Sequence, residues 1–196
     1  MNRHIKKNGF TILELLVVIS VMGIITGIVI AKYRGYGTNA LFANATENIV
    51  LSLRQAQVYG VGVKGSSGCT TGTTAFDCSY GVYFSTATPN SATLFVDNNN
   101  NGIFDSGATP TEAVQTISWI APITITRITC DGANCPSGGA DTGGSSVLDV
   151  TFRRPNPAAT LHDGAGSSYT TGVITISDGT KTAVITVTKT GQISLQ

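Results

Sequence analysis

The stretch KKNGFTILELLVVISVMGIITGIVIAKY, residues 6–33, contains the strongest signals in this sequence. No charged residue occurs from Leu15 to Ala31, and a helix over residues 10–31 is long enough to cross a hydrocarbon core of roughly 30 Å. Glu14 nevertheless lies near the start of this stretch. An ionised carboxylate in lipid costs several kcal/mol unless it is paired, so Glu14 indicates a function that needs the charge.

A basic leader precedes the apolar stretch, with Arg3, Lys6 and Lys7 before Phe10. Basic residues beside a membrane segment favour the cytoplasmic side, so the rest of the chain is expected to be exported. An ordinary secretory signal is cut after its apolar region, at a small-x-small site. Here the best small residue at a boundary is Gly9, which comes before the apolar region. The sequence therefore favours a retained anchor over a removed secretory signal.

The run GFTILELLVVISVMGII, residues 9–25, resembles the prepilin-type cleavage and methylation motif of type IV pilins and type II secretion pseudopilins. The resemblance implies that a prepilin peptidase cuts between Gly9 and Phe10 and that the new amine of Phe10 is methylated. It also implies that Glu14, fifth in the mature chain, pairs with the Phe10 amine of a neighbouring subunit. Such a pair attracts strongly in a low dielectric, whereas a lone carboxylate is penalised. The alternative is an accidental glutamate in a plain anchor.

Two details of the apolar segment bear on the kind of subunit. Gly23 and Gly27 have G-x-x-x-G spacing, which allows close packing of membrane helices but also occurs by chance in short apolar runs. Many major pilins carry a proline where this chain has Ala31, and the first proline here is Pro89. That departure favours a pseudopilin or a minor pilin.

The whole chain is predicted to have an α+β, pilin-like fold. We expect a leader at residues 1–9, a transmembrane and filament-core helix at 10–31, an amphipathic helix at 32–62 and a β-rich head at 63–196. Apolar residues at helical spacing predict the buried helix face, namely Phe42, Ala45, Ile49, Leu53 and Ala56. Polar residues predict the opposite face, namely Asn44, Glu47, Asn48, Ser52 and Gln55.

Glycines mark the limits of this amphipathic helix. A break is expected near Gly35 and Gly37, and the helix is expected to end at Gly60, Gly62 and Gly65. Beyond it, short segments rich in Val, Ile, Thr and aromatic residues predict strands at 80–85, 92–97, 113–119, 123–129, 146–152, 172–177 and 182–195. An antiparallel sheet should place its apolar face on the helix, and residues 132–146 are predicted to form a loop.

Four segments of the head resemble the GspH/FimT type of minor pilin and pseudopilin: SLRQAQVYG, LFVDNNNNGIFD, VTFRRPNP and TKTGQISL. This resemblance implies a place at or near the tip of a type IV-like filament. FimT-like members have been associated with DNA binding in uptake pili. The formal net charge of +1 does not provide the basic surface of a dedicated nucleic-acid binder, so DNA is not the favoured partner.

The four cysteines form two pairs that are close in sequence: Cys69 with Cys78, and Cys130 with Cys135. Neither pair has C-x-x-C spacing, and neither His4 nor His162 lies near them, so a zinc site is not expected. We predict two small-loop disulfides, which suit an exported head in an oxidising compartment.

An Asx-rich segment matches a D-x-N-x-N-G calcium loop, with candidate ligands at Asp97, Asn99, Asn101 and Asp105. The sixth position is Gly102, which suits the sharp turn, and Ile103 can offer its carbonyl. The twelfth position is Ala108 instead of the bidentate glutamate, so binding is expected to be weak. The alternative is an Asx-rich hairpin turn held by bonds from side chains to the backbone. Calcium is the cofactor that the sequence suggests, and no other is expected.

Other polar residues were weighed as functional sites. Arg153 and Arg154, beside Pro155, fit either a contact to nucleic acid or a partner subunit, or a solvated strand end. His162 and Asp163 lie in a Gly/Ser-rich stretch, and neither Ser167 nor Ser168 has a G-x-S-x-G setting. We therefore expect His162 at the surface and no enzymatic activity.

The sequence as a whole predicts a structural subunit of a type IV pilus or a type II secretion pseudopilus. It would cross the inner membrane once, with its head exported. The expected partners are the prepilin peptidase/methylase, other pilin or pseudopilin subunits and the inner membrane. The alternatives are a ligand- or DNA-binding tip pilin and a membrane-anchored exported domain without a filament.

Overall fold

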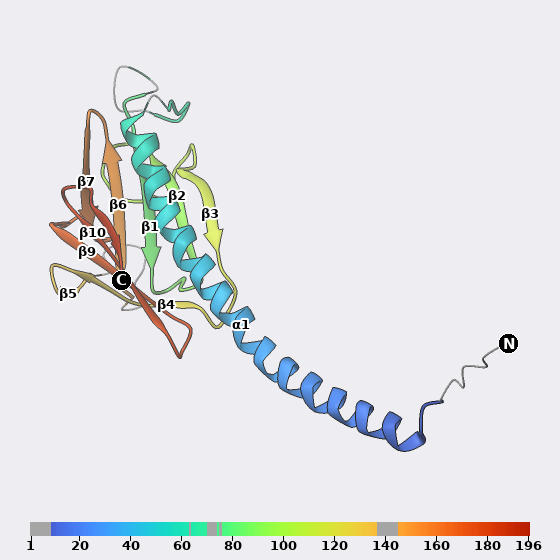
Figure 1. Cartoon of the computed structure of the whole chain (residues 1–196). Helices are drawn as coiled ribbons and strands as arrows, with labels where there is room; N and C mark the ends of the chain where they lie inside the picture. Colours follow the sequence, from blue (N-terminus) through green and yellow to red (C-terminus); the bar gives the residue numbers. More distant parts are fainter. Residues whose placement is uncertain (1–8, 63, 70–73, 75, 137–144) are drawn as a thin grey trace. The chain divides into compact units, whose positions relative to one another are not determined.

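The computed structural model describes residues 9–62, 64–69, 74, 76–136 and 145–196, except for the side chains of residues 32–36. Residues 1–8 of the expected leader, and with them His4, lie outside this range. The chain divides into two compact units, residues 1–41 and residues 42–196 (Figure 1). The first unit contributes the start of the helix, and the second contains the rest of the helix and all the strands.

A single helix, α1, extends from Ile12 to Val61. It continues through Gly35 and Gly37, where the sequence suggested a break. Glycine lowers helix stability by about 1 kcal/mol relative to alanine but does not by itself interrupt the hydrogen bonds. The helix ends at Val61, between Gly60 and Gly62, as expected from the glycines there.

The part of α1 in the second unit buries the face that the apolar spacing predicts. Its members are Phe42, Ala45, Ile49, Leu53 and Ala56. Full burial of a side chain such as Ile49 or Leu53 contributes about 1.5–3 kcal/mol. Ser52 was expected on the polar face but is buried. Its hydroxyl donates to the carbonyl of Ile49 at 2.7 Å. This bond satisfies the polar group inside the core.

The first sheet has the strand order β3-β2-β1-β6-β7-β8, and every neighbouring pair is antiparallel (Figure 1). Its strands are β1 (Ser79–Ser85), β2 (Ser91–Asp97), β3 (Ala113–Ser118), β6 (Val147–Arg153), β7 (Asn156–His162) and β8 (Ser168–Tyr169). Val82 at the centre pairs with Leu94 on one side and Val150 on the other, so apolar residues face the core in register.

The second sheet has the strand order β11-β10-β9-β4-β5 and is also antiparallel. Its strands are β4 (Thr124–Cys130), β5 (Ala133–Asn134), β9 (Thr171–Ser177), β10 (Thr182–Thr188) and β11 (Ile193–Leu195). Side chains along β9 and β10 alternate between buried and partly exposed, which is the pattern of a sheet with one wet face. The head therefore contains two antiparallel sheets rather than one.

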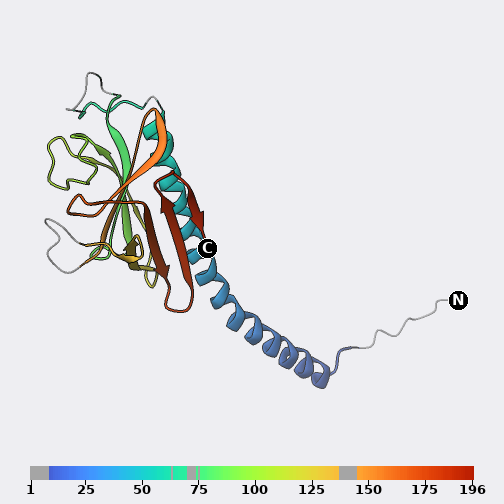
Figure 2. The same cartoon turned by 90° about the vertical axis from the view of Figure 1, so that its left-hand side faces the viewer.

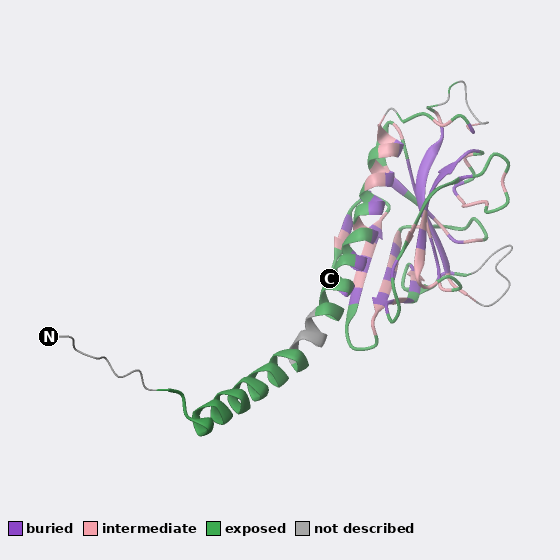
Figure 3. Ribbon diagram, turned by 90° about the vertical axis from the view of Figure 1, so that its right-hand side faces the viewer, coloured by how far each residue is buried: buried purple, intermediate pink, exposed green. Residues whose placement is uncertain are grey.

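The two sheets and the second part of α1 enclose one hydrophobic core (Figure 3). Val150 of β6, Ile174 of β9 and Ile49 of α1 are all fully buried in it. Arg54 of α1 also donates to the carbonyl of Ile193 in β11 at 3.2 Å, which links the helix to the second sheet (Figure 2).

Three strands were not predicted from the sequence: β5, β7 and β8. β5 lies in the segment expected to be a loop, of which residues 137–144 are outside the described range. β7 begins at Asn156 and contains Pro157, which cannot donate a ladder hydrogen bond and is tolerated at the start of a strand. Both predicted disulfides are present, Cys69–Cys78 and Cys130–Cys135.

Candidate functional site

A side-chain cap holds the N-terminal end of α1. Gly9 and Phe10 precede the helix and are exposed. The hydroxyl oxygen of Thr11 accepts the backbone N–H of Glu14 at 3.2 Å, and the same hydroxyl donates to Glu14 Oε2 at 3.5 Å. Thr-x-x-Glu is the spacing of a capping box, and sequence reasoning missed this role although the pattern is readable. Among the described residues, the Glu14 carboxylate therefore has one weak and exposed partner, the Thr11 hydroxyl.

The apolar part of α1 is exposed along its whole length. Residues 12–31 are long and apolar enough to span a membrane, and none of this segment is buried within the chain (Figure 3). A Cβ added at Gly23 or Gly27 would meet nothing within 4 Å, so this side of the helix has room for another helix. Because so much apolar surface is unfavourable in water, the segment needs lipid or other helices around it.

The Asx-rich loop follows β2 directly and is organised around Asp97. Oδ1 of this fully buried carboxylate accepts the N–H of Asn101 at 3.1 Å, and Oδ2 accepts the N–H of Gly102 at 2.8 Å. Gly102 has a φ of 82°, which L side chains rarely adopt. Burial raises the pKa of Asp97, although these N–H donors partly oppose the shift.

Three side chains of this loop converge on one point. The Nδ2 groups of Asn99 and Asn101 both donate to Oδ2 of Asp105, at 2.8 and 3.0 Å. Their Oδ1 atoms accept backbone N–H groups two residues further on, as in Asx turns. The third, fifth and ninth loop positions therefore meet, and Asp97 holds the backbone beside them.

Glu112 closes the other end of this segment, just before β3. Its Oε1 accepts the N–H of Asn98 at 3.0 Å, and its Oε2 accepts the N–H of Asp105 at 2.8 Å. The residue is fully buried, and burial raises its pKa to about 7, with a smaller contribution from the charges of Asp105 and Asp97. Both oxygens of this carboxylate are therefore occupied by the loop backbone.

Asp149 of β6 lies beneath the same loop, although it is distant in sequence. Its Oδ1 accepts the N–H of Phe104 at 3.2 Å, and its side chain is fully buried. Burial raises the pKa of Asp149 well above its ordinary value, and the nearby charges of Asp97, Glu112 and Asp105 add to the shift. Neither Asp149 nor the buried position of Glu112 could be assigned from sequence, because only the folded sheet brings them to the loop.

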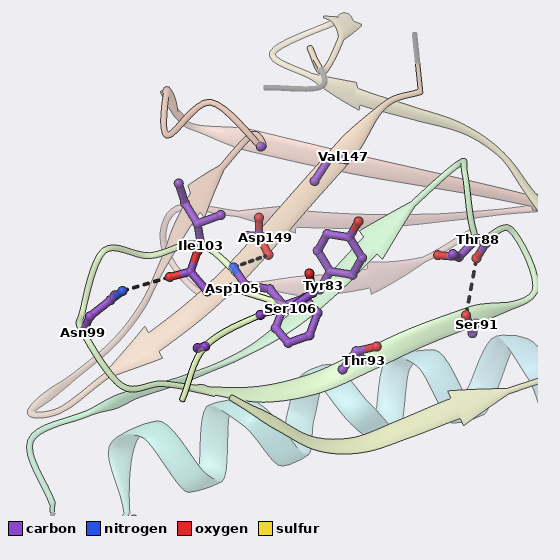
Figure 4. Close-up of a pocket in the computed structure, with 14 residues that line it drawn as sticks. Tyr83, Thr88, Ser91, Thr93, Asn99, Ile103, Asp105, Ser106, Val147 and Asp149 are labelled. Carbon is purple, nitrogen blue, oxygen red and sulfur yellow. Dashed lines mark hydrogen bonds between the residues drawn. The ribbon is translucent and has the colours of Figure 1, made fainter. Parts of the chain in front are cut away.

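A hollow of about 810 Å³ opens between this loop and the outer face of β1, β2 and β6. Figure 4 draws Asn99, Asp105 and Asp149 among its lining residues, with the Asn99–Asp105 bond dashed. The ring of Phe104 packs against Tyr83, with centroids 5.1 Å apart, and against Phe95 at 5.4 Å. The aromatic contacts hold the loop over the sheet.

The remaining candidate residues have structural contacts. His162 ends β7, is half-buried at the surface and places Nδ1 3.2 Å from the carbonyl oxygen of Gly102. Arg154 forms an ion pair with Asp77 at 3.0 Å, whereas Arg153 is exposed. Asp163 is fully buried and accepts bonds from nearby backbone N–H groups and from the hydroxyl of Tyr169.

Comparison with known proteins identifies the N-terminal segment. Residues 5–30 match the family model described as the prokaryotic N-terminal methylation motif. No curated protein and no solved structure matches the chain. The motif contains Gly9, Phe10 and Glu14, and it implies processing by prepilin peptidase and assembly with other pilins. This motif, followed by an exposed apolar helix, is consistent with a type IV prepilin-like protein.

Proposed function

We propose that this protein is a structural subunit of a type IV pilus or of a type II secretion pseudopilus. Removal of residues 1–9 and methylation of the Phe10 amine would precede assembly through the N-terminal helix. The observation that carries the proposal is Glu14, a carboxylate on an apolar helix segment that is entirely exposed within the chain. Its contact with the Thr11 hydroxyl, at 3.5 Å, is too weak to offset transfer of a charge into lipid.

The electrostatics of Glu14 then favour assembly over the lone subunit. In the membrane, the unpaired carboxylate of a single subunit is penalised. In a filament, the amine of Phe10 on a neighbouring subunit is a cation close to the carboxylate in a low dielectric, and attraction there is much stronger than in water. The exposed apolar helix provides the packing surface, and Glu14 selects the register.

We assign the head to a minor subunit of the GspH/FimT type. The segments that support this assignment end α1, follow β2, join β6 to β7 and join β10 to β11. Ala31 in place of the proline that is common in major pilins favours the same assignment. The protein would cross the inner membrane once and present its head outside.

Processing is tested by mass spectrometry of the protein isolated from cells. We expect a mature chain that begins at Phe10, lacks residues 1–9 and carries one added methyl group. Cleavage after residue 31 would overturn the proposal, because the helix needed for assembly would be lost. An uncut N-terminus would leave a plain membrane anchor as the function.

Assembly is tested by comparing Glu14→Ala and Glu14→Gln with the unaltered chain. The fraction of processed protein in sheared filaments should fall about tenfold or more, because each change removes a charge that is paired only in the filament. Asp178→Asn is the matched control, since Asp178 is a partly exposed carboxylate of the head, in the turn between β9 and β10. Equal fractions for Glu14→Ala and the unaltered chain would exclude an assembly role for Glu14.

A further inference from the structure

Three buried carboxylates lie at the Asx-rich loop, and one of them, Asp149, lines the hollow beside it. Asp97, Glu112 and Asp149 are each fully buried. Within the described part of the chain, the ion pair is Arg154–Asp77, which includes none of these carboxylates, and no Lys, Arg or His lines the hollow. Buried charges are normally paired or bound to a metal, because desolvation of a lone charge is costly.

One buried oxygen atom at this site lacks a hydrogen-bond partner. Oδ2 of Asp149 is buried and has no hydrogen-bond partner among the described residues, while Oδ1 accepts the N–H of Phe104. Buried polar atoms in folded proteins are rarely left unsatisfied. A cation bound at Oδ2 of Asp149 would supply the missing partner and compensate the charge of the carboxylate.

The loop offers oxygen atoms at the spacing that a calcium-type cation uses. The side chains of Asn99 and Asn101 already meet at Oδ2 of Asp105, and a cation there would replace the two amide N–H groups that now donate to this oxygen. The missing element is the carboxylate of the twelfth position, which is Ala108 here. Asp149 accepts a hydrogen bond from the backbone N–H of Phe104, the residue between Ile103 and Asp105, and so lies directly beneath the loop.

Glu112 is a weaker candidate for that missing carboxylate. Its two oxygens each accept a backbone N–H, from Asn98 and from Asp105, so it acts as a brace for the loop. Oδ1 of Asp149 accepts a hydrogen bond, whereas Oδ2 has no partner among the described residues. Both carboxylates are fully buried, so the free oxygen of Asp149 distinguishes them.

We propose that the head binds one divalent cation of the calcium type between the Asx-rich loop and β6. Its oxygen ligands come from Asn99, Asn101, Asp105 and the carbonyl of Ile103, and Asp149 supplies the carboxylate that the loop lacks at Ala108. Asp97, whose two oxygens accept the N–H groups of Asn101 and Gly102, holds the loop backbone in place. Neutral amides and a backbone carbonyl suit calcium better than magnesium, which needs a stricter octahedral arrangement and keeps its waters. The proposal concerns the head alone and does not depend on filament assembly.

Calorimetric titration of the full chain in detergent, freed of metal by a chelator, tests this site with calcium chloride and with magnesium chloride. We expect binding of about one calcium per chain, weaker binding of magnesium and a rise in Tm of about 5–10 °C at a calcium concentration 100 times the Kd. Absence of calcium heat together with an unchanged Tm would overturn the proposal.

Substitutions distinguish the carboxylates that bind the cation from other carboxylates of the head. Asp105→Asn and Asp149→Asn should each reduce calcium affinity at least about tenfold, because ligand charge sets affinity in such loops. The matched control Asp178→Asn changes a partly exposed carboxylate outside the loop, and this variant should bind calcium as the unaltered chain does. Unchanged affinity in Asp149→Asn would remove Asp149 from the site. Asp105 is half-buried, so Asp105→Asn provides the test should Asp149→Asn fail to fold by circular dichroism.

Discussion

Gly60 near the end of α1 lies directly against the backbone carbonyl of Phe152 in β6, with no room for a Cβ between them. The close approach brings the last turn of the helix onto the first sheet. Backbone cannot move aside as a flexible side chain can, so any side chain at this position must push the helix and β6 apart.

Gly60→Ala should therefore destabilise the head by about 1–3 kcal/mol, the usual cost of overpacking. Urea unfolding, followed by circular dichroism, measures the change. Gly107→Ala is the matched control, because a Cβ at Gly107 meets nothing within 4 Å. Equal unfolding midpoints for the two variants would contradict the close helix–sheet contact.

Asp163→Ala should lower the free energy of unfolding by about 2–3 kcal/mol, because it removes a buried carboxylate that accepts two backbone N–H groups and the hydroxyl of half-buried Tyr169. Oδ1 accepts the N–H groups of Ala165 and Ser167 at 2.9 and 2.8 Å, and Oδ2 accepts the hydroxyl of Tyr169 at 2.8 Å. Tyr169→Phe removes only one of these bonds and should cost about 1 kcal/mol. A larger loss in Tyr169→Phe than in Asp163→Ala would show that Asp163 does not organise this turn.

Asp131 predicts an acid-dependent contribution to stability. Its carboxylate accepts bonds from the hydroxyl and N–H of Thr170 and from the N–H of Thr171, and these bonds lower its pKa from the ordinary value of 3.8. A lowered pKa in the folded state means that the contribution is full above about pH 4 and is lost as the pH falls through the lowered value.

Asp131→Asn should therefore be less stable than the unaltered chain at pH 7, and the difference should shrink as the pH falls below 3.8. Urea midpoints of both proteins at pH 7, pH 4 and pH 2.5 provide the comparison. A constant difference across these pH values would show that the charge of Asp131 does not matter to the turn between β4 and β5.

Loss of either disulfide should cost about 2–3 kcal/mol, because each bond restricts a small loop in the unfolded chain. The double change of Cys130 and Cys135 to Ser should cost more than the same change at Cys69 and Cys78. Cys130 and Cys135 belong to the main core, where two buried hydroxyls replace sulfur atoms, whereas Cys69 is half-buried. Non-reducing peptide mapping checks the pairing, and free thiols or crossed pairs would contradict it.

Local sequence was sufficient for the N-terminal segment and for most of the secondary structure. Gly9, Phe10 and Glu14 lie close together in the sequence, so the motif that they form is recognisable without the fold. The match to the methylation motif covers the same stretch. The helix face was readable because 3.6-residue spacing places Ile49, Leu53 and their neighbours on one side. Strands with regular alternation, such as β9 and β10, were readable for the same kind of reason.

Tertiary structure decided the features that depend on long-range contact. Ser52 appeared polar-facing by its type, yet its bond to the Ile49 carbonyl makes burial tolerable. β7 lacks a strand-like composition and exists because β6 and β8 flank it. Asp149 stands in an apolar strand and reaches the Asx-rich loop only because pairing of β6 with β1, and of β1 with β2, places it under Phe104. Sequence spacing determines a helix or strand, but a site built from three strands exists only when their register is set.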